Sequence, residues 1–311
     1  MRLELVLQTS IPLFSLIFLG FVARRQGFLR AGDERVFSSY LYYFGLPALL
    51  IVDLSEISFN MDTLGFMGLN LVPLFLVLGV VVLLGFIFGV DRRRLFLYVI
   101  VTAFGNLGFF GLAFIRFAFN SLEAERYAAL SVASINTLGF ILSLILLEIA
   151  SNKEKDESLH RKIVSSLSKN PLILSIVVGV GFSLIGFNIP APVSSGLHMI
   201  GGSVAPIAIF MLGVSIYGKE YSGLLEAGFI SSIRLLILPL VALLVSKWFG
   251  LSLLQTSIIV VMYGTPLALS MVILSERYEF MEKQVSSIIL VSSLLSGLTM
   301  NLWLYLIDVL M

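Results

Sequence analysis

The residues with the clearest chemical potential in this sequence are polar and lie within long apolar runs. Asn106 stands in the run Phe104–Ala113, where Gly105, Gly108 and Gly111 follow one another at three-residue spacing. Glycine weakens a helix because its backbone loses more freedom on folding than that of other residues. Backbone groups released in apolar surroundings need a cavity, a neighbour or a ligand as their partner. This run is therefore a candidate site for binding a polar molecule.

A second run, Met262–Ser270, has the same character. It contains a proline, which removes a backbone donor and clashes with the preceding helical turn. We predict that both runs are broken helices that share one binding site. The residues predicted to line it are Gly105, Asn106, Gly108, Gly111, Gly264, Thr265, Pro266 and Ser270.

Two further polar residues lie deep in apolar runs. Arg234 stands about ten residues into the run 224–248, and a charge at such depth usually faces a cavity or a partner. It would balance an acidic ligand, or pair with a carboxylate such as Glu148 or Asp53 and fix helix packing. Asn136 would contact the ligand or join two helices through hydrogen bonds. Both residues are candidate charge or polar partners of the ligand.

Other kinds of chemistry find little support in the residue types. The chain has no cysteine and only two histidines, His160 and His198, so neither a thiolate site nor an imidazole metal centre is expected. It shows no helical histidine pair, no paired mid-span aspartates and no nucleophile–base pair. We therefore predict no enzymatic activity, no metal and no cofactor.

Composition indicates that lipid surrounds most of the chain. Of the 311 residues, 58% are hydrophobic and 13% are charged, whereas soluble domains carry about 25% charged residues. A spanning helix needs about 20 apolar residues, so roughly ten of them account for nearly the whole length. The predicted fold class is an all-α polytopic membrane protein with ten transmembrane helices. The predicted spans are 4–24, 33–53, 64–89, 95–119, 126–150, 170–188, 193–217, 224–248, 252–274 and 284–308.

Basic residues predict the orientation of these spans. Most lysines and arginines lie in the loops of one side, among them Arg24, Arg92–Arg94 and the linker 151–169, and this excess marks the cytoplasmic side. Both termini would then lie outside the cytoplasm. The basic cluster of the first span follows its apolar run, so we expect a retained helix and not a signal peptide. We expect a multi-pass protein of the cell inner membrane, in contact with lipid and not with nucleic acid.

An internal echo relates the two halves of the chain at a fixed offset of 159 residues. Pro47 recurs as Pro206, and Phe104-Gly105 recurs as Tyr263-Gly264. Five spans per copy force the second copy to enter the membrane inverted, and inverted repeats with matched breaks are typical of secondary transporters. The broken helices would cross near mid-membrane and offer their positive N-terminal ends to an anion. The predicted domains are a five-helix repeat at 1–150, a cytoplasmic linker at 151–169 and an inverted five-helix repeat at 170–311.

Short motifs run through nearly the whole chain. They are Ile11-Pro12-Leu13-Phe14, Leu46-Pro47-Ala48-Leu49-Leu50, Asn106 with Gly108 and Gly111, Lys169-Asn170-Pro171-Leu172, Ala205-Pro206-Ile207-Ala208, Arg234 with Pro239, and Thr265-Pro266-Leu267-Ala268. In this order and spacing the chain resembles the auxin efflux carrier family, including plant PIN proteins and bacterial relatives. It departs from the family pattern at Ala113, where proline is common, and at Ser270, where asparagine is usual. With alanine at 113, the fourth helix is expected to be opened by Gly108 and Gly111 alone and to be more helical than in its relatives.

The resemblance implies a fold like that of bile-acid symporters, with broken helices four and nine crossing. It implies a dimeric scaffold of helices one, two, six and seven beside a mobile transport unit of helices three to five and eight to ten. Family substrates are organic anions, such as auxin or dicarboxylates. Asn106, Thr265 and Ser270 would hold the anion, and Pro47 and Pro206 would line the scaffold side. The function expected is export of a small organic anion by an elevator-type secondary transporter that forms a homodimer.

Two alternative functions stay open from the sequence. Sodium- or proton-coupled uptake of an organic anion would need an acidic cluster or a cation cage near the crossing, and few carboxylates lie within the spans. A membrane receptor would bind the ligand without moving it. Flux that ignores cation gradients would exclude the first alternative, and any flux would exclude the second.

Overall fold

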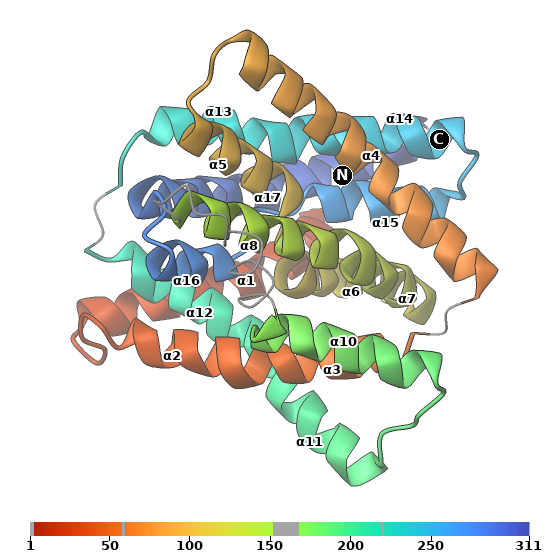
Figure 1. The fold of residues 1–311 in the computed structure, drawn as a ribbon, viewed down its shortest axis with the longest axis horizontal. Helices are drawn as coiled ribbons and strands as arrows, with labels where there is room; N and C mark the ends of the chain where they lie inside the picture. Colours follow the sequence, from red (N-terminus) through yellow and green to blue (C-terminus); the bar gives the residue numbers. More distant parts are fainter. Residues whose placement is uncertain (1–2, 58–59, 152–167, 219–220, 311) are drawn as a thin grey trace. The chain divides into compact units, whose positions relative to one another are not determined.

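The computed structural model describes residues 3–57, 60–151, 168–218 and 221–310 (Figure 1). Most of the predicted linker 151–169 lies outside these ranges, as does His160. The described chain is helical, and its only β-type pairing is an isolated bridge between Gly105 and Leu267. The helices overlap all ten predicted spans, and their ends differ from the predicted ends by at most four residues.

Six helices of the described chain are long and apolar enough to cross a membrane. They are Glu34–Ser55, Met61–Ile87, Leu122–Ser151, Ala191–Ile216, Leu224–Trp248 and Glu282–Leu310. Three shorter apolar helices are Leu107–Arg116, Pro171–Leu184 and Leu253–Tyr263. The molecule is therefore a multi-pass membrane protein. The ten-span inverted topology stays a prediction.

Contacts divide the chain into two compact units, and each unit draws helices from both halves of the sequence. Unit 2 comprises the described residues of 13–64 and 152–219, and unit 1 comprises the remainder. Unit 2 contains α1 (Leu3–Arg25, from Leu13 onward), α2 (Glu34–Tyr40), η1 (Leu41–Gly45), α3 (Leu46–Ser55), α10 (Pro171–Leu184), α11 (Ala191–Gly202) and α12 (Val204–Ile216).

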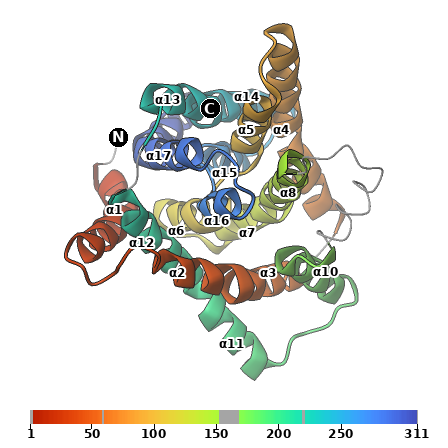
Figure 2. The same ribbon diagram turned by 60° about the vertical axis from the view of Figure 1, so that its left-hand side comes forward.

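Glycine lets the helices of unit 2 approach closely. A Cβ on Gly20 of α1 would lie 2.0 Å from the carbonyl oxygen of Phe210, and one on Gly213 of α12 would lie 1.9 Å from that of Ile17. Gly179 of α10 faces α3 in the same way, and the two helices lie side by side in Figures 1 and 2. Small residues at such contacts are the usual means of packing helices in lipid.

Unit 1 holds the helices that surround the predicted breaks. In Figure 2 its helix α13 lies beside α17, and α14 runs on from α13. Its elements are α4 (Met61–Ile87, from Gly65 onward), α5 (Arg92–Ala103), η2 (Leu107–Gly111), α6 (Leu112–Phe119), α7 (Leu122–Ser131), η3 (Val132–Asn136), α8 (Thr137–Ser151), α13 (Leu224–Ser232), η4 (Ile233–Ile237), α14 (Leu238–Trp248), α15 (Leu253–Tyr263), α16 (Ser270–Arg277) and α17 (Glu282–Leu310).

Side-chain caps fix where several helices of unit 1 begin. Asp91 accepts a hydrogen bond from the backbone N–H of Arg94 at the start of α5, and Ser121 caps α7 in the same way. Ser252 and Gln255 form a reciprocal capping box at the start of α15. Such caps satisfy N–H groups that the first helical turn leaves without a partner. The caps at Asp91 and Ser252 fix where α5 and α15 begin, and these are the two helices that lead into the breaks.

Four wide π-turns, η1 to η4, interrupt the helices of the described chain. Two of them end two residues before a proline, η1 before Pro47 and η4 before Pro239. Because a proline ring clashes with the preceding turn, a wider turn there relieves the clash. The other two follow Asn106 and end on Asn136. The three π-turns of unit 1 thus lie at the three polar residues singled out in the apolar runs: Asn106, Asn136 and Arg234.

Candidate functional site

The two predicted breaks meet inside unit 1. Helix α5 ends at Ala103 and the chain becomes helical again at Leu107, while α15 ends at Tyr263 and α16 begins at Ser270. The N–H of Asn106 donates to the carbonyl of Pro266 at 2.8 Å, and the N–H of Ala268 donates to that of Phe104 at 3.1 Å. These two bonds flank the Gly105–Leu267 bridge, so the breaks pair as a short antiparallel ladder.

The first break is complete although no proline opens it. Phe104 adopts φ −107° and ψ 90°, and Asn106 adopts φ −85° and ψ 52°, so neither residue is helical. The break is therefore complete with alanine at position 113, and it lies at 104–106 and not at Gly108 and Gly111, which were expected to open it. The ladder gives Phe104 and Asn106 the hydrogen bonds that a continuous helix would have supplied. Partners across the break, and not a local helix breaker, hold it open.

Arg234 lies against both breaks and is fully buried. Its Nε donates to the carbonyl of Thr265 at 2.8 Å, and its Nη2 donates to the Thr265 hydroxyl at 3.2 Å. Its Nη1 donates to the carbonyls of Thr102 at 2.8 Å and Val101 at 3.4 Å. Arg234 lies in the π-turn η4. One side chain thus joins the end of α5 to the second break.

The carboxylate partners suggested for Arg234 are not found. Among the described residues no carboxylate forms an ion pair with Arg234, and its hydrogen bonds go to Thr265, Thr102 and Val101. Asp53 belongs to unit 2. Backbone carbonyls therefore hold this guanidinium, and its positive charge is not neutralised by a carboxylate.

Gly105 supplies the space for the guanidinium. A Cβ at this position would lie 1.5 Å from Nη2 of Arg234 and 2.3 Å from its Cζ. The backbone of Gly105 does not take a positive φ. Glycine is needed here because the guanidinium approaches so closely, and not because of backbone conformation.

Two amides at the crossing carry unused hydrogen-bonding atoms. Nδ2 of Asn106 and Oδ1 of Asn136 are buried and have no hydrogen-bond partner. Asn106 is 3% exposed and immediately precedes η2, which packs against η3, the π-turn that ends on Asn136. Buried polar atoms are almost always paired, so this unpaired donor at the crossing is a candidate contact for a ligand. The donor of Asn106 suits an acceptor such as a carboxylate oxygen.

The remaining predicted lining residues of unit 1 differ in how tightly they are packed. Gly111 faces Met262 and Thr265, and a Cβ there would lie 2.8 Å from the Met262 sulfur. Gly108 has no heavy atom within 4 Å of its Cβ position and so borders open space. Ser270, half-buried, is the first residue of α16.

The two scaffold prolines lie in the other unit. Pro47 is in α3 and is half-buried, and Pro206 is in α12 and is exposed. Both belong to unit 2, so the structure does not gather them with the crossing residues inside one unit. Their predicted contact with the substrate stays a prediction.

Sequence reasoning missed Ser292 of α17. Its hydroxyl accepts a hydrogen bond from the N–H of Leu267 at 3.2 Å, in the middle of the second break. Four buried serines lie on this apolar helix, and their recurrence was the available signal. They are Ser287, Ser292, Ser293 and Ser296. Residue Tyr263, the last of α15, was also missed, and its hydroxyl donates to the carbonyl of Asn70 in α4.

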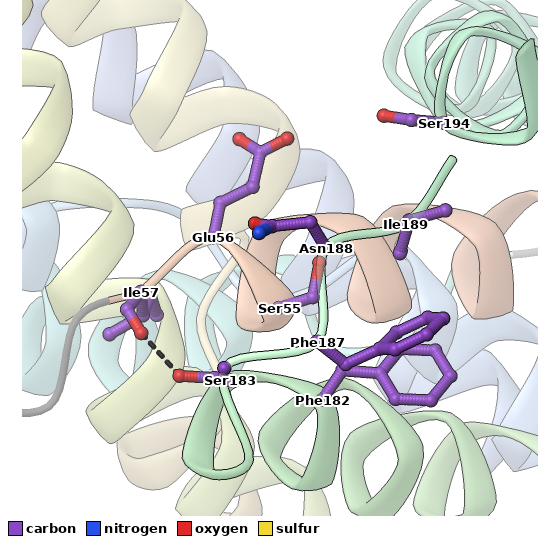
Figure 3. Close-up of a pocket in the computed structure, with 10 residues that line it drawn as sticks. Ser55, Glu56, Ile57, Phe182, Ser183, Phe187, Asn188, Ile189 and Ser194 are labelled. Atoms are coloured by element: carbon purple, nitrogen blue, oxygen red, sulfur yellow. Dashed lines mark hydrogen bonds between the residues drawn. The ribbon is translucent and has the colours of Figure 1, made fainter. Parts of the chain in front are cut away.

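A pocket of about 510 Å³ lies in unit 2, and it includes none of the predicted site residues (Figure 3). The rings of Phe182 and Phe187 form one wall, with their centroids 4.8 Å apart. The hydroxyl of Ser183 closes an edge by donating to the carbonyl of Ile57. Glu56 also lines the pocket; its side chain is exposed, and its Oε1 lies 3.1 Å from Nε2 of His198. Size alone does not make this pocket the substrate site, because none of the residues predicted to bind the substrate lines it.

Comparison with known proteins finds membrane transporters, in agreement with the apolar composition and the long apolar helices. The sequence profile described as "Membrane transport protein" matches residues 5–304. The chain is 22% identical over 303 residues to the uncharacterized transporter YfdV of Escherichia coli (strain K12), covering 95% of each chain. It is 23% identical over 296 residues to the uncharacterized transporter MJ1031 of Methanocaldococcus jannaschii, covering 93% of this chain and 94% of that one.

A third relative carries a substrate in its name. The "Putative malonate transporter" of Rhizobium meliloti is 24% identical over 315 residues, covering 96% of this chain and 94% of its own. All three relatives are named as transporters, and none is named as an enzyme. Since the profile covers nearly the whole chain, this protein belongs to the membrane transport protein family, the family of the auxin efflux carriers.

Proposed function

We propose that this membrane transporter carries a small organic anion, auxin-like or dicarboxylate-like, bound where the two broken helices pair. The observation that carries the proposal is the unpaired Nδ2 of Asn106, a donor buried at the start of η2. The first N–H groups of a helix have no partner within the helix, and the helix dipole makes this end positive. Side-chain donor and helix end together suit the oxygens of a carboxylate.

The charge of Arg234 favours the same ligand. A buried guanidinium without a carboxylate partner raises the electrostatic potential around it, and low polarity strengthens this effect. An anion at the crossing would lower the electrostatic energy of this buried positive charge. Asn106, Thr265 and Ser270 would contact the anion, with backbone at Gly105 and Gly264 and room beside Gly108. Asn136 would offer a second amide.

The two compact units support an elevator-type mechanism. The predicted scaffold helices, spans one, two, six and seven, correspond to the helices of unit 2, and the paired breaks lie wholly in unit 1. A complete substrate-binding element within one unit is what a moving transport unit requires. In this proposal unit 1 carries the anion past unit 2, where Pro47 and Pro206 line its path.

Export is the direction that we propose. A negative membrane potential favours exit of an anion by about 2.3 kcal/mol per charge per 100 mV. The proposal includes a cell inner membrane with both termini outside the cytoplasm, an orientation that the loop charges favour. A homodimer formed through unit 2 completes the proposal.

Anion flux through purified protein in liposomes tests this function. Liposomes loaded with radiolabelled malonate or indole-3-acetate should release it through the wild type under an imposed potential. Asn106→Ala removes the unpaired donor and should slow release by about tenfold, the worth of one hydrogen bond to a charged group. Asn301→Ala is the matched control, because its Nδ2 donates to the carbonyl of Gly297 in its own helix. Unchanged flux in Asn106→Ala would refute the site, and binding without any flux would indicate a receptor.

A further inference from the structure

The guanidinium of Arg234 occupies a position built from oxygen atoms. Three backbone carbonyls and one hydroxyl surround it, from Val101, Thr102 and Thr265. Val101 and Thr102 lie in the last turn of α5, where carbonyls have no partner within the helix. The carbonyl of Thr265 belongs to the non-helical second break. All four oxygens therefore come from the two interrupted helices.

Such a set of oxygens is suited to a monovalent cation. In secondary transporters, carbonyls of unwound backbone and the C-terminal ends of half-helices coordinate the coupling Na⁺. The end of α5 supplies the negative pole of the helix dipole as well as the two carbonyls. Here a protein side chain takes that position, and arginine keeps its charge at neutral pH.

The surrounding sequence accommodates this side chain specifically. Gly105 leaves room for Nη2, since any Cβ there would lie 1.5 Å from it. The π-turn η4 places Arg234 at the crossing, and Pro239 follows two residues after that turn ends. The guanidinium is fully buried, and no described carboxylate pairs with it. The space at Gly105, the π-turn η4 and the full burial of the side chain thus all favour a fixed cation at this point.

We infer that Arg234 is a resident cation, a positioning residue that fills the place of a coupling cation and holds the two breaks together. Anion transport then needs no Na⁺ or K⁺ gradient. The charge that a coupled carrier takes from solution is here a permanent part of the protein. This inference rests on the proposed function for its transport arm only, because the cation-filled position itself can be tested without a substrate.

The first test measures thermal unfolding of the purified full-length chain. Arg234→Ala empties the position, and its unfolding midpoint should fall by about 5 °C or more. Millimolar guanidinium chloride should restore most of that loss, whereas tetramethylammonium chloride, which cannot donate hydrogen bonds, should not. Arg116→Ala is the matched control: Arg116 is an exposed arginine that pairs with Glu125 at 3.6 Å, and guanidinium should not affect its midpoint. Equal effects of the two salts on Arg234→Ala would overturn the inference.

The second test measures anion release from liposomes with equal salts on both sides or with imposed Na⁺ or K⁺ gradients. Wild-type release should not respond to either gradient. Arg234→Ala should be slower by about tenfold or more and should recover with guanidinium. A wild type that requires Na⁺ would refute the inference. If no anion moves through the wild type, the proposed function fails, while the unfolding test still decides the role of Arg234.

Two more variants keep the test valid if Arg234→Ala does not fold. Arg234→Lys retains a cation, and Arg234→Gln retains polarity without charge. Recovery of both the unfolding midpoint and release in the lysine variant, but not in the glutamine variant, supports a resident cation. Equal behaviour of the two variants would mean that the positive charge at this position does not matter, and this would overturn the inference.

Discussion

The two breaks occupy equivalent places in the sequence echo, yet they are built differently. The first spans three residues, 104–106, and leads directly into the π-turn η2. The second spans six residues, 264–269, contains Pro266 and is supported by Ser292 from α17. At the glycine that the echo equates, a Cβ on Gly105 would collide with Arg234, whereas one on Gly264 would have its nearest neighbour at 3.4 Å.

This difference shows that an echoed residue need not keep an echoed role. Gly105 makes room for a guanidinium, while Gly264 only caps the end of α15, with φ −75° and ψ 2°. Gly105 in the first break leaves room for the cation, while the end of α5 and the second break each supply two of the four acceptors that hold it. The sequence echo therefore concerns where helices stop, and not what each stop does.

The largest expected effect separates the two glycines. Gly105→Ala should lower the free energy of unfolding by about 3 kcal/mol, because a methyl group there displaces Arg234 from its carbonyls. Gly264→Ala should change it by less than about 0.5 kcal/mol, since its new methyl meets only ordinary contacts. Denaturant unfolding of both variants makes the comparison. Equal losses in the two would show that the breaks are equivalent after all.

A smaller effect is expected from the support of the second break. Ser292→Ala leaves the buried N–H of Leu267 without its acceptor and should reduce stability by about 2 kcal/mol. Ser296→Ala is the control, because its hydroxyl donates only within α17, to the carbonyl of Ser293. Hydrogen exchange at Leu267 should quicken in the first variant alone. Unchanged protection there would mean that the ladder stands without α17.

The smallest effect concerns the glycines that follow the first break. Gly111→Ala should cost about 1 kcal/mol, since its methyl would press on Met262 and Thr265 but the methionine can move. Gly108→Ala meets no atom within 4 Å and should leave thermal stability unchanged or slightly raised. A larger loss at Gly108 than at Gly111 would contradict the described packing.

Residue types were sufficient to locate the breaks. Glycine and proline weaken helices, so Gly105 and Pro266 marked two candidate runs, although Pro12 and Pro73 lie inside continuous helices. The sequence echo singled out these two runs from the others. Asn106 and Arg234 could be predicted as site residues because polar and charged side chains deep in apolar runs usually face a cavity or a partner. Apolar length predicted the helices themselves to within a few residues. These features are local, and local chemistry decides them.

The partners could not be predicted in the same way. Arg234 binds backbone carbonyls, which every residue possesses, so no residue type marks Val101 or Thr102 as acceptors. The ion pair suggested with Glu148 or Asp53 assumed that a buried charge seeks an opposite charge. Ser292 reaches Leu267 from a separate helix, a contact that only the packing of unit 1 creates. The first break was expected to be more helical because position 113 is not proline, whereas the pairing that opens it is long-range and is not marked by any residue type.

The π-turns have a consequence for how this family can vary. A π-turn closes over five residues where an α-turn closes over four, so each one holds a single extra residue. Deleting one residue within Leu107–Gly111 or Ile233–Ile237 can therefore leave an unbroken α-helix with every later side chain in register with its old face. Elsewhere in a span, the same deletion rotates the rest of the helix by about 100° and turns its buried face outward. One-codon deletions at these turns should therefore keep the rest of each helix in register, so that the loss of stability they cause reports on the local geometry around Asn106 or Arg234.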